Sequence, residues 1–246
     1  MSSLFDSAEF NQRLFFRRKS STPCPPGARD SFVEVEPGIR LHARTHLNAT
    51  AFATLVFFHG NGETVGDYDE LAARFTALGL EVVFFDYRGY GQSNGVPTLR
   101  ALYADAVKCI ATVERTRPVV LFGRSLGAAA SAELAGRDGL IDGLVLESGG
   151  SNLAALVARR GFPPYTLSDE ERGVFDPVVK LSRCRVPALV LHGRNDDLIL
   201  PREAEAAFAA LASQDKQLVF VPGGHNDLSF SREYWDALAT FVAKWK

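Results

Sequence analysis

Short apolar runs alternate with helix-like stretches from residue 54 to the end of the chain, and this alternation constrains the fold more than any other feature. The apolar runs lie at 54–58, 81–85, 119–122, 143–146, 188–191 and 217–221. Runs that are apolar on both faces predict strands covered on both sides, as in a parallel sheet. Between them, apolar residues recur at helical spacing, for example at Leu71, Phe75 and Leu78. This order predicts a doubly wound α/β sheet with helices on both faces.

Two segments depart from this alternation. The stretches 32–35 and 39–43 alternate in polarity on either side of Pro37-Gly38, which predicts a β-hairpin and a small antiparallel edge. The interval 151–183 separates two predicted strands by more than one helix requires. We therefore expect a small lid insert at about 151–183.

Residues 1–30 are interpreted as an N-terminal appendage to a single main domain at 31–246. A short helix is expected over 6–16, and the proline-rich stretch 20–27 predicts an extended linker, because proline disfavours helix in the residue before it. Basic and aromatic side chains are mixed at Phe10, Arg13, Leu14, Phe15, Phe16, Arg17, Arg18 and Lys19. This cluster could contact an anionic membrane surface, but packing of the aromatic residues on the main domain is the simpler expectation.

The composition favours a small-molecule partner. Lys plus Arg number 27 against 29 for Asp plus Glu, so the net charge of -2 provides no field that would attract nucleic acid. The 3 cysteines are widely spaced and form neither a CxxC pair nor a disulfide framework, which fits a reducing compartment. No signal peptide is evident, and no segment approaches the ~20 apolar residues that span a bilayer. We expect a cytoplasmic protein without an integral membrane segment.

The strongest chemical signal is the run Gly123-Arg124-Ser125-Leu126-Gly127. It follows a predicted strand and opens a helix of small residues, which is the context that a nucleophilic serine at a sharp turn requires. The strained turn needs small neighbours two positions on either side of the serine, and both are glycine. The helix N-terminus also provides free N–H groups for a developing oxyanion. Ser125 is therefore the predicted nucleophile.

A serine nucleophile needs a base, and the chain has 5 histidines. Where a nucleophile occupies such a turn, the acid and then the histidine follow it along the chain, and only His192 and His225 follow Ser125. His225 lies in a glycine-containing loop after the last predicted strand, where an imidazole can reach over the sheet edge. His192 ends a strand, and we expect it to be packed or hydrogen-bonded there. His225 is the predicted base.

The orienting acid is expected in the loop after the strand 188–191. Asp196 is our choice and Asp197 is the close competitor, because only one of two adjacent side chains can face His225. Glu147, at the end of another predicted strand, is a third candidate.

The oxyanion of the reaction needs a second donor besides the backbone N–H of Leu126. The run His59-Gly60-Asn61-Gly62-Glu63 lies where the loop after the third strand should approach the nucleophile. The predicted oxyanion hole therefore consists of the backbone N–H groups of Asn61 and Leu126.

Together these motifs closely resemble the α/β-hydrolase family, over about residue 30 to the end of the chain. The resemblance rests on His59-Gly60-Asn61, Asp86-Tyr87-Arg88-Gly89-Tyr90-Gly91-Gln92-Ser93, Gly123-Arg124-Ser125-Leu126-Gly127, His192-Gly193-Arg194-Asn195-Asp196 and Gly224-His225. It implies the α/β-hydrolase fold, with a mostly parallel eight-stranded sheet, helices on both faces and a small lid insert. It also implies that the run 86–93 is scaffolding and not catalytic.

Within the family, the chain looks most like the intracellular branch related to serine aminopeptidase-like and acyl-thioesterase-like hydrolases. It departs from the family pattern at one position, because members commonly place proline four residues after the acid. Here Leu200 stands four residues after Asp196, and Pro201 follows it. Counting from His192 favours Asp196, whereas counting back from Pro201 favours Asp197.

The same residues bear on three alternative functions. A metal site at His42 and His46 is disfavoured because no cysteine or carboxylate cluster lies at ligand spacing. A fold that only binds a ligand would not need a serine, an acid and a histidine in this order. Cofactor-free perhydrolase chemistry would use the same triad.

The sequence therefore predicts a serine hydrolase that needs neither cofactor nor metal. Ser125 would attack an ester, thioester or amide of a small-molecule acyl substrate, with carboxylesterase-like activity preferred. An apolar wall for modest acyl chains is expected from Phe162, Pro163, Pro164, Tyr165, Val174 and Phe175 in the insert.

Overall fold

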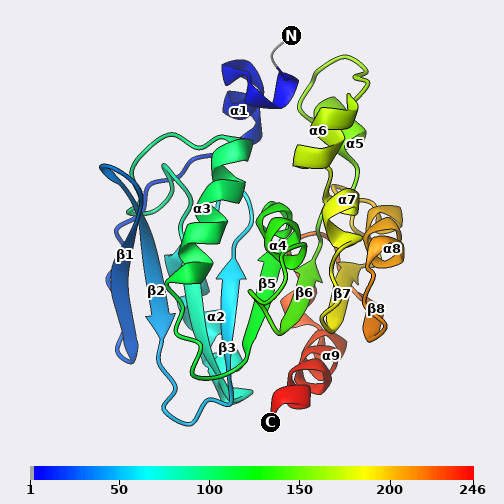
Figure 1. Cartoon of the computed structure of the whole chain (residues 1–246). Coiled ribbons are helices and arrows are strands. Elements are labelled where there is room, and N and C mark those ends of the chain that lie inside the picture. Colours follow the sequence, from blue (N-terminus) through cyan, green and yellow to red (C-terminus); the bar gives the residue numbers. More distant parts are fainter. Residues whose placement is uncertain (1–2) are drawn as a thin grey trace.

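The computed structural model describes residues 3–246, and its centre is an eight-stranded sheet (Figure 1). The strand order is β1-β2-β4-β3-β5-β6-β7-β8, with antiparallel pairing of β1 with β2 and β2 with β4 and parallel pairing elsewhere. The strands are β1 (Ala28–Glu36), β2 (Ile39–His46), β3 (Ala53–Phe58), β4 (Leu80–Phe85), β5 (Val119–Arg124), β6 (Gly143–Glu147), β7 (Ala188–Gly193) and β8 (Lys216–Val221). The predicted mostly parallel sheet and its antiparallel edge are confirmed.

Helices cover both faces of this sheet. They are α1 (Ala8–Leu14), α2 (Asp69–Ala77), α3 (Leu99–Ala111), α4 (Gly127–Ala135), α5 (Leu153–Arg159), α6 (Asp169–Phe175), α7 (Pro177–Leu181), α8 (Pro201–Ala210) and α9 (Arg232–Val242), with short 3-10 turns at Leu4–Asp6, Val65–Tyr68, Leu228–Phe230 and Ala243–Trp245. One core layer joins the sheet to α3, α4, α7 and α8, and a second layer joins it to α2 and α9.

The two core layers explain why the strands are apolar on both faces. In β3, Val56 and Phe58 belong to the first layer, whereas Leu55 and Phe57 belong to the second. All four side chains are buried. Because side chains alternate along a strand, a sheet covered on both faces needs apolar residues at consecutive positions.

Polar side chains mark where the helices around the site begin. The Thr98 hydroxyl accepts a hydrogen bond from the N–H of Ala101 at the start of α3, and Asn152 caps α5 in the same way. Ser168 and Glu171 form a capping box at the start of α6. These side chains replace the acceptors that the first turn of a helix lacks.

The N-terminal segment packs against the insert. In Figure 1, α1 lies beside α5 and α6 at the end of the molecule toward which the parallel strands point. The Phe5 ring contacts Phe10 and Phe175 at centroid distances of 5.1 and 4.9 Å, and Phe10 contacts Phe162 at 5.7 Å. The expected packing of the N-terminal aromatic residues is confirmed by the burial of Phe5 and Phe10, although Phe16 is 56% exposed. The boundary between an appendage and a main domain at residue 30 stays a prediction.

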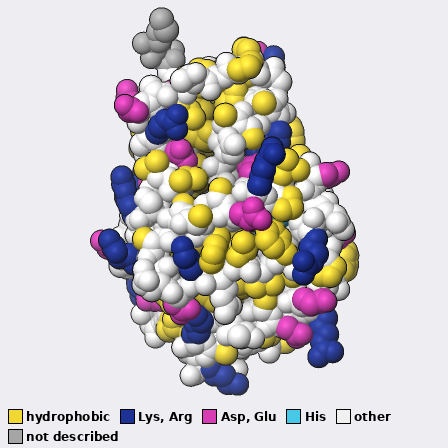
Figure 2. Space-filling model, turned by 90° about the vertical axis from the view of Figure 1, so that its right-hand side faces the viewer, with side chains coloured by type: hydrophobic (Ala, Val, Ile, Leu, Met, Phe, Trp, Pro, Cys, Tyr) yellow, Lys and Arg dark blue, Asp and Glu magenta, His cyan; other side chains and the backbone are white. Residues whose placement is uncertain are grey.

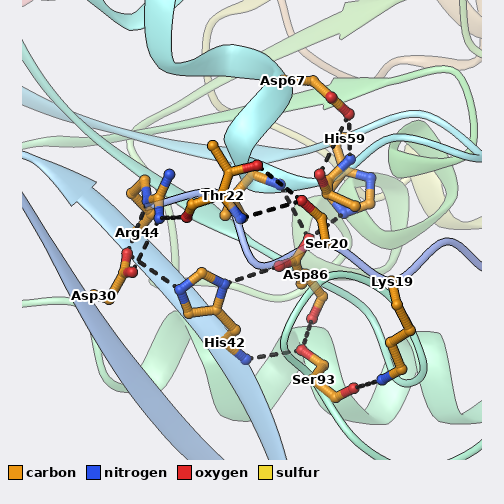
Figure 3. A network of polar contacts seen from close by, with 12 residues as sticks. Lys19, Ser20, Thr22, Asp30, His42, Arg44, His59, Asp67, Asp86 and Ser93 are labelled. Carbon is orange, nitrogen blue, oxygen red and sulfur yellow. Dashed lines mark hydrogen bonds and ion pairs between the residues drawn. The ribbon is translucent and has the colours of Figure 1, made fainter. Parts of the chain in front are cut away.

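A buried polar network joins β2 to the turn after β4 (Figure 3). His42 Nδ1 lies 2.9 Å from the Asp86 carboxylate and His42 Nε2 lies 3.1 Å from that of Asp30. The Ser93 hydroxyl accepts from the backbone N–H of His42 and donates to the carbonyl oxygen of Asp86. These contacts give the run 86–93 the scaffolding role that the resemblance implies, and they place the His42 ring between two carboxylates within the fold.

The same network holds the extended segment before β1. Arg44 donates to the Asp30 carboxylate at 2.8 Å, to Asp69 at 2.7 Å and to the carbonyl oxygen of Thr22 at 2.9 Å. Lys19 donates to the carbonyl oxygen of Ser93. These hydrogen bonds hold Lys19 and Thr22 of the N-terminal segment against β2 and the turn after β4.

Asp86→Asn is expected to lower stability and to reduce its loss in acid. Burial raises the pKa of Asp86, but hydrogen bonds from His42 and His59 outweigh it, and the net pKa lies below the ordinary 3.8. A depressed pKa means that the stabilisation is complete above about pH 4 and is lost as the pH falls below it. Urea unfolding should show a loss of about 2 kcal/mol at pH 7 and a slope below pH 4 that is shallower by up to about 1.4 kcal/mol per pH unit.

Asp197→Asn provides the matched control, because Asp197 is exposed and makes no ion pair with another of residues 3–246. Its unfolding free energy should stay within about 0.5 kcal/mol of wild type. Equal losses in both variants would show that the Asp86 network contributes nothing specific.

Charges are mixed on the face shown in Figure 2, where basic and acidic side chains lie among each other. This distribution agrees with the net charge of -2. Among residues 3–246, no helix combines the length and the apolar character needed to cross a membrane.

Candidate active site

Ser125 lies in the turn between β5 and α4, with a φ of 51°. A Cβ at Gly127 would overlap the carbonyl oxygen of Phe58, and one at Gly123 would overlap the side chain of Ser131. The glycines therefore allow the turn to approach β3 and α4 more closely than a larger residue would permit. The left-handed backbone of Ser125 is the kind of strained conformation that a tightly packed turn can hold.

The structure brings Ser125, His225 and Asp196 into one hydrogen-bonded chain. His225 Nε2 lies 2.9 Å from Ser125 Oγ, and His225 Nδ1 lies 2.8 Å from Asp196 Oδ2. A carboxylate only accepts hydrogen bonds, so its contact assigns the ring proton to Nδ1. Nε2 is then free to accept the proton of the serine hydroxyl.

Asp196 is held in place from two sides and is 2% exposed. Its Oδ1 accepts hydrogen bonds from the backbone N–H groups of Leu198 and Ile199 at 3.0 and 2.9 Å. Burial raises the pKa of Asp196, but hydrogen bonds from His225 and Ile199 lower it, and the net pKa lies below its ordinary value. The carboxylate is therefore charged at neutral pH.

The other acid candidates lie elsewhere. Asp197 is exposed. Glu147, at the end of β6, accepts from the Tyr234 hydroxyl at 2.7 Å and pairs with Arg124 Nε at 3.1 Å.

The side chain of His192 is fully buried, with Nε2 2.8 Å from the carbonyl oxygen of Ile199. This confirms the expectation of a packed and hydrogen-bonded histidine at the end of β7.

Two backbone N–H groups are available beside Ser125. Among residues 3–246, neither the N–H of Asn61 nor that of Leu126 donates to a protein acceptor, and both residues line the same cavity as Ser125. The side chain of Asn61 is already engaged, because it donates to the carbonyl oxygen of Leu14 and accepts from the N–H of Phe16 and the hydroxyl of Tyr90. These contacts fix the loop and leave its backbone N–H free.

Arg124 joins the three loops of the site, a role that the sequence did not indicate. It pairs with Glu63 in the loop after β3 and with Glu147 at the end of β6. It also donates to the side chain of Asn226 at 2.8 Å and to the carbonyl oxygen of His225 at 3.3 Å. Glu63 and the arginine directly before Ser125 are the sequence features that bear on this link, and neither by itself indicates that the two side chains meet.

Arg124→Leu is expected to lower the free energy of unfolding by about 3–5 kcal/mol, because it leaves the buried Glu147 without its cation. The double variant Arg124→Leu with Glu147→Gln should recover part of this loss. Urea unfolding followed by far-UV circular dichroism measures both.

Arg137→Leu is the matched control for Arg124→Leu. Arg137 pairs with Glu133 across one helical turn, and its side chain is 51% exposed. An exposed pair of this kind contributes about 0.3–0.5 kcal/mol. Losses of similar size in the two single variants would rule out a structural role for the Arg124 network.

The cavity at Ser125 has a mostly apolar lining drawn from several elements. Its walls are Leu14, Asn61, Leu99, Tyr103, Leu126, Ala129, Gly150, Asn152, Leu153, Leu156, Arg159, Arg160, Phe175, Pro177 and Ile199. Of the wall residues expected from the insert, Phe175 is found there. Phe162, Pro163, Pro164, Tyr165 and Val174 are not, so that part of the prediction is wrong. The insert instead contributes residues of α5, which the sequence analysis did not single out.

Two aromatic residues of the insert that do not line the cavity contact the N-terminal segment instead. The Phe162 ring lies 4.6 Å from the guanidinium carbon of Arg13, and the Tyr165 ring lies 6.0 Å from that of Phe5. The sequence predicts that the N-terminal aromatic residues pack on the main domain, but no local pattern identifies the insert as their partner. Leu14 of this segment also lines the cavity.

Comparison with known proteins agrees with this fold. Residues 49–168 match the family model "Serine aminopeptidase, S33". Protein Rv2307c of Mycobacterium tuberculosis is 32% identical over 250 residues, which cover 95% of this chain and 88% of that protein. The human α/β-hydrolase domain-containing protein 17B is 31% identical over 203 residues, which cover 78% of this chain and 66% of its own.

Among solved structures, esterase Pf2001 of Pyrococcus furiosus superposes with a TM-score of 0.76 and 17% identity, covering 94% of this chain and 98% of the esterase. At this identity the likeness concerns the fold. The chain belongs to the α/β-hydrolase family, and the family model that it matches is that of a hydrolase.

Proposed function

We propose that this protein is a serine hydrolase that cleaves carboxylic esters through an acyl-enzyme on Ser125. The observation that carries the proposal is the hydrogen-bonded chain from Asp196 through His225 to Ser125, which ends in a mostly apolar cavity. A buried carboxylate that orients the histidine and a histidine within 2.9 Å of the serine oxygen are the contacts that nucleophilic catalysis requires. Thioesters and amides are open to the same chemistry.

In the first half of the proposed reaction, Ser125 Oγ attacks the carbonyl carbon of the ester and His225 Nε2 takes the hydroxyl proton. The negative charge that develops on the carbonyl oxygen is stabilised by the N–H groups of Asn61 and Leu126. The carbonyl then reforms, the bond to the alcohol oxygen breaks, and His225 returns its proton to the leaving alcohol. Asp196 stabilises the imidazolium that exists between these two transfers.

In the second half, water replaces the alcohol. His225 removes a proton from the water, whose oxygen attacks the acyl carbon, and the same N–H groups stabilise the second oxyanion. Collapse of this intermediate breaks the bond to Ser125 Oγ, which recovers its proton from His225. The products are the free acid and the original enzyme.

The cavity lining supports acyl esters of modest length over peptides. Leu99, Leu126, Leu153 and Leu156 contribute apolar surface next to Ser125, and such surface favours hydrocarbon by about 25 cal/mol per Å² buried. In the part of the chain that the structure describes, the lining contains no Asp or Glu that would bind the amino group of a peptide. A clear preference for aminoacyl amides over acyl esters would contradict this assignment.

Fluorophosphonate labelling tests the nucleophile, and ester hydrolysis tests the substrate class. We expect a single labelled peptide that maps by mass spectrometry to Ser125, and serine-dependent release of p-nitrophenol from acetate, butyrate and octanoate esters. Absence of both labelling and turnover would identify a protein that keeps the fold and cavity for binding alone. Faster formation of peracid with hydrogen peroxide than of acid with water would instead favour perhydrolase activity.

A further inference from the structure

Two neighbouring arginines of the insert line the cavity at Ser125, and only one of them is paired. Arg159 donates to the carboxylate of Glu203 at 2.6 Å, and the side chain of Glu203 is 4% exposed. Arg160 forms no ion pair and no side-chain hydrogen bond with any other of residues 3–246. Arg160 is therefore a cavity-lining arginine that no carboxylate of residues 3–246 pairs with.

Arg160 is placed by two segments that are distant in the sequence. It follows the last residue of α5, and its guanidinium carbon lies 5.0 Å from the ring centroid of Phe16 in the N-terminal segment. Its Nε is buried without a hydrogen-bond partner. The side chain as a whole is half-buried, and Arg160 is one of the residues that line the cavity.

The charge of Arg160 is uncompensated in the free protein. Burial, followed by the neighbouring Arg159, lowers the pKa of Arg160 below its ordinary value. Among residues 3–246, no carboxylate lines the cavity. A partly desolvated guanidinium without an acceptor is unfavourable, and an anion that reaches it gains charge-assisted hydrogen bonds in an environment that screens them weakly.

We propose that Arg160 binds a carboxylate carried by the substrate, so that the preferred substrates of the Ser125 site are esters with a second, anionic end. This inference rests on the proposed function for its catalytic consequence. The planar fork of an arginine matches the two oxygens of a carboxylate. A carboxylate fits better than a phosphate, which carries about 1.5 to 2 negative charges at pH 7, because the charge of Arg159 is already balanced by Glu203.

Matched esters and amides of the same shape test the proposal kinetically. Monomethyl glutarate and methyl glutaramate place an anion or a neutral amide in the acyl half, and O-butyrylglycolate and O-butyrylglycolamide place them in the alcohol half. For the half that reaches Arg160, kcat/KM of the wild type should favour the acid over the amide by about tenfold to a hundredfold. The acid–amide pair that shows the preference identifies whether the acyl half or the alcohol half of the substrate carries the anion.

Variants of Arg160 should lower the ratio of kcat/KM for the acid to kcat/KM for the amide, to an extent that depends on the substitution. Arg160→Gln should bring it close to one, and Arg160→Lys should keep a smaller preference, because an ammonium provides the charge without the fork. Arg183→Gln removes the same charge from an exposed arginine without an ion pair among the described residues and should leave the ratio unchanged. Equal kcat/KM for acid and amide in both pairs, or a preference that persists in Arg160→Gln, would overturn the proposal.

Calorimetry separates this proposal from the proposed function. Binding of the same esters to Ser125→Ala requires no turnover, and the acid should bind about tenfold to a hundredfold more tightly than its amide. The double variant Ser125→Ala with Arg160→Gln should lose the difference. Tighter binding of the acid than of the amide, without any serine-dependent hydrolysis, would refute the proposed hydrolase and support the role of Arg160. Hydrolysis with equal binding of acid and amide would refute the role of Arg160 alone.

Discussion

Replacing Ser125 by alanine is expected to lower kcat for p-nitrophenyl butyrate by about a millionfold, to the level that binding and the oxyanion donors alone can supply. Without Oγ no acyl-enzyme can form, and His225 has no hydroxyl proton to accept. The fold should be retained, because alanine is smaller than serine and the turn is held by the close contacts of Gly123 and Gly127. KM should change little, since Oγ contributes mainly to the transition state.

The measurement is p-nitrophenol release by wild type and variant at equal concentration, with far-UV circular dichroism to check folding. Ser182→Ala is the matched control, because Ser182 is exposed and its hydroxyl donates only to the carbonyl oxygen of Val179. It should retain wild-type kcat. Turnover by Ser125→Ala close to that of wild type would exclude Ser125 as the nucleophile.

Asp196→Asn is expected to lower kcat by about ten thousandfold. The asparagine oxygen can still accept from the N–H groups of Leu198 and Ile199, which now bond to Asp196 Oδ1. Its NH2 group then faces His225 Nδ1 and forces the ring proton onto Nε2, where the base must be free. The loss arises from the wrong histidine tautomer, with little change in fold.

Asp197→Asn decides between the adjacent aspartates. Asp197 is exposed, whereas Asp196 Oδ2 lies 2.8 Å from His225 Nδ1. Asp197→Asn should therefore lower kcat by less than about twofold, as a surface substitution does. A larger fall in Asp197→Asn than in Asp196→Asn would reverse the assignment. Small and equal falls in both would point to Glu147.

Much of the fold could be predicted because it depends on local pattern. Apolar runs at consecutive positions identify β3 to β8, and alternating polarity on either side of Pro37-Gly38 identifies β1 and β2, with bounds within a few residues. The two glycines that flank Ser125 mark a turn whose backbone a larger residue would not fit. Chain order leaves His192 and His225, and the position of His225 in a loop after the last strand favours it; its ring is found next to Ser125.

The choice between Asp196 and Asp197 lies beyond the sequence. The spacing to Pro201 favours Asp197, whereas the spacing from His192-Gly193 favours Asp196, and both side chains have the same chemistry. The turn after β7 directs Asp196 inward, where Leu198 and Ile199 donate to it, and leaves Asp197 in solvent. This outcome depends on backbone direction in an irregular loop, for which the sequence has no periodic signal.

The sequence by itself determined the sheet, the nucleophile turn and the candidate residues, because each depends on side-chain types at short spacing. Only the tertiary structure decided what surrounds them. It placed Leu14 of the N-terminal segment on the cavity wall, joined Arg124 to Glu63 and Glu147, and left Arg160 without a carboxylate. These are contacts between segments far apart in the chain, and packing of the whole molecule selects among the many partners that composition would allow.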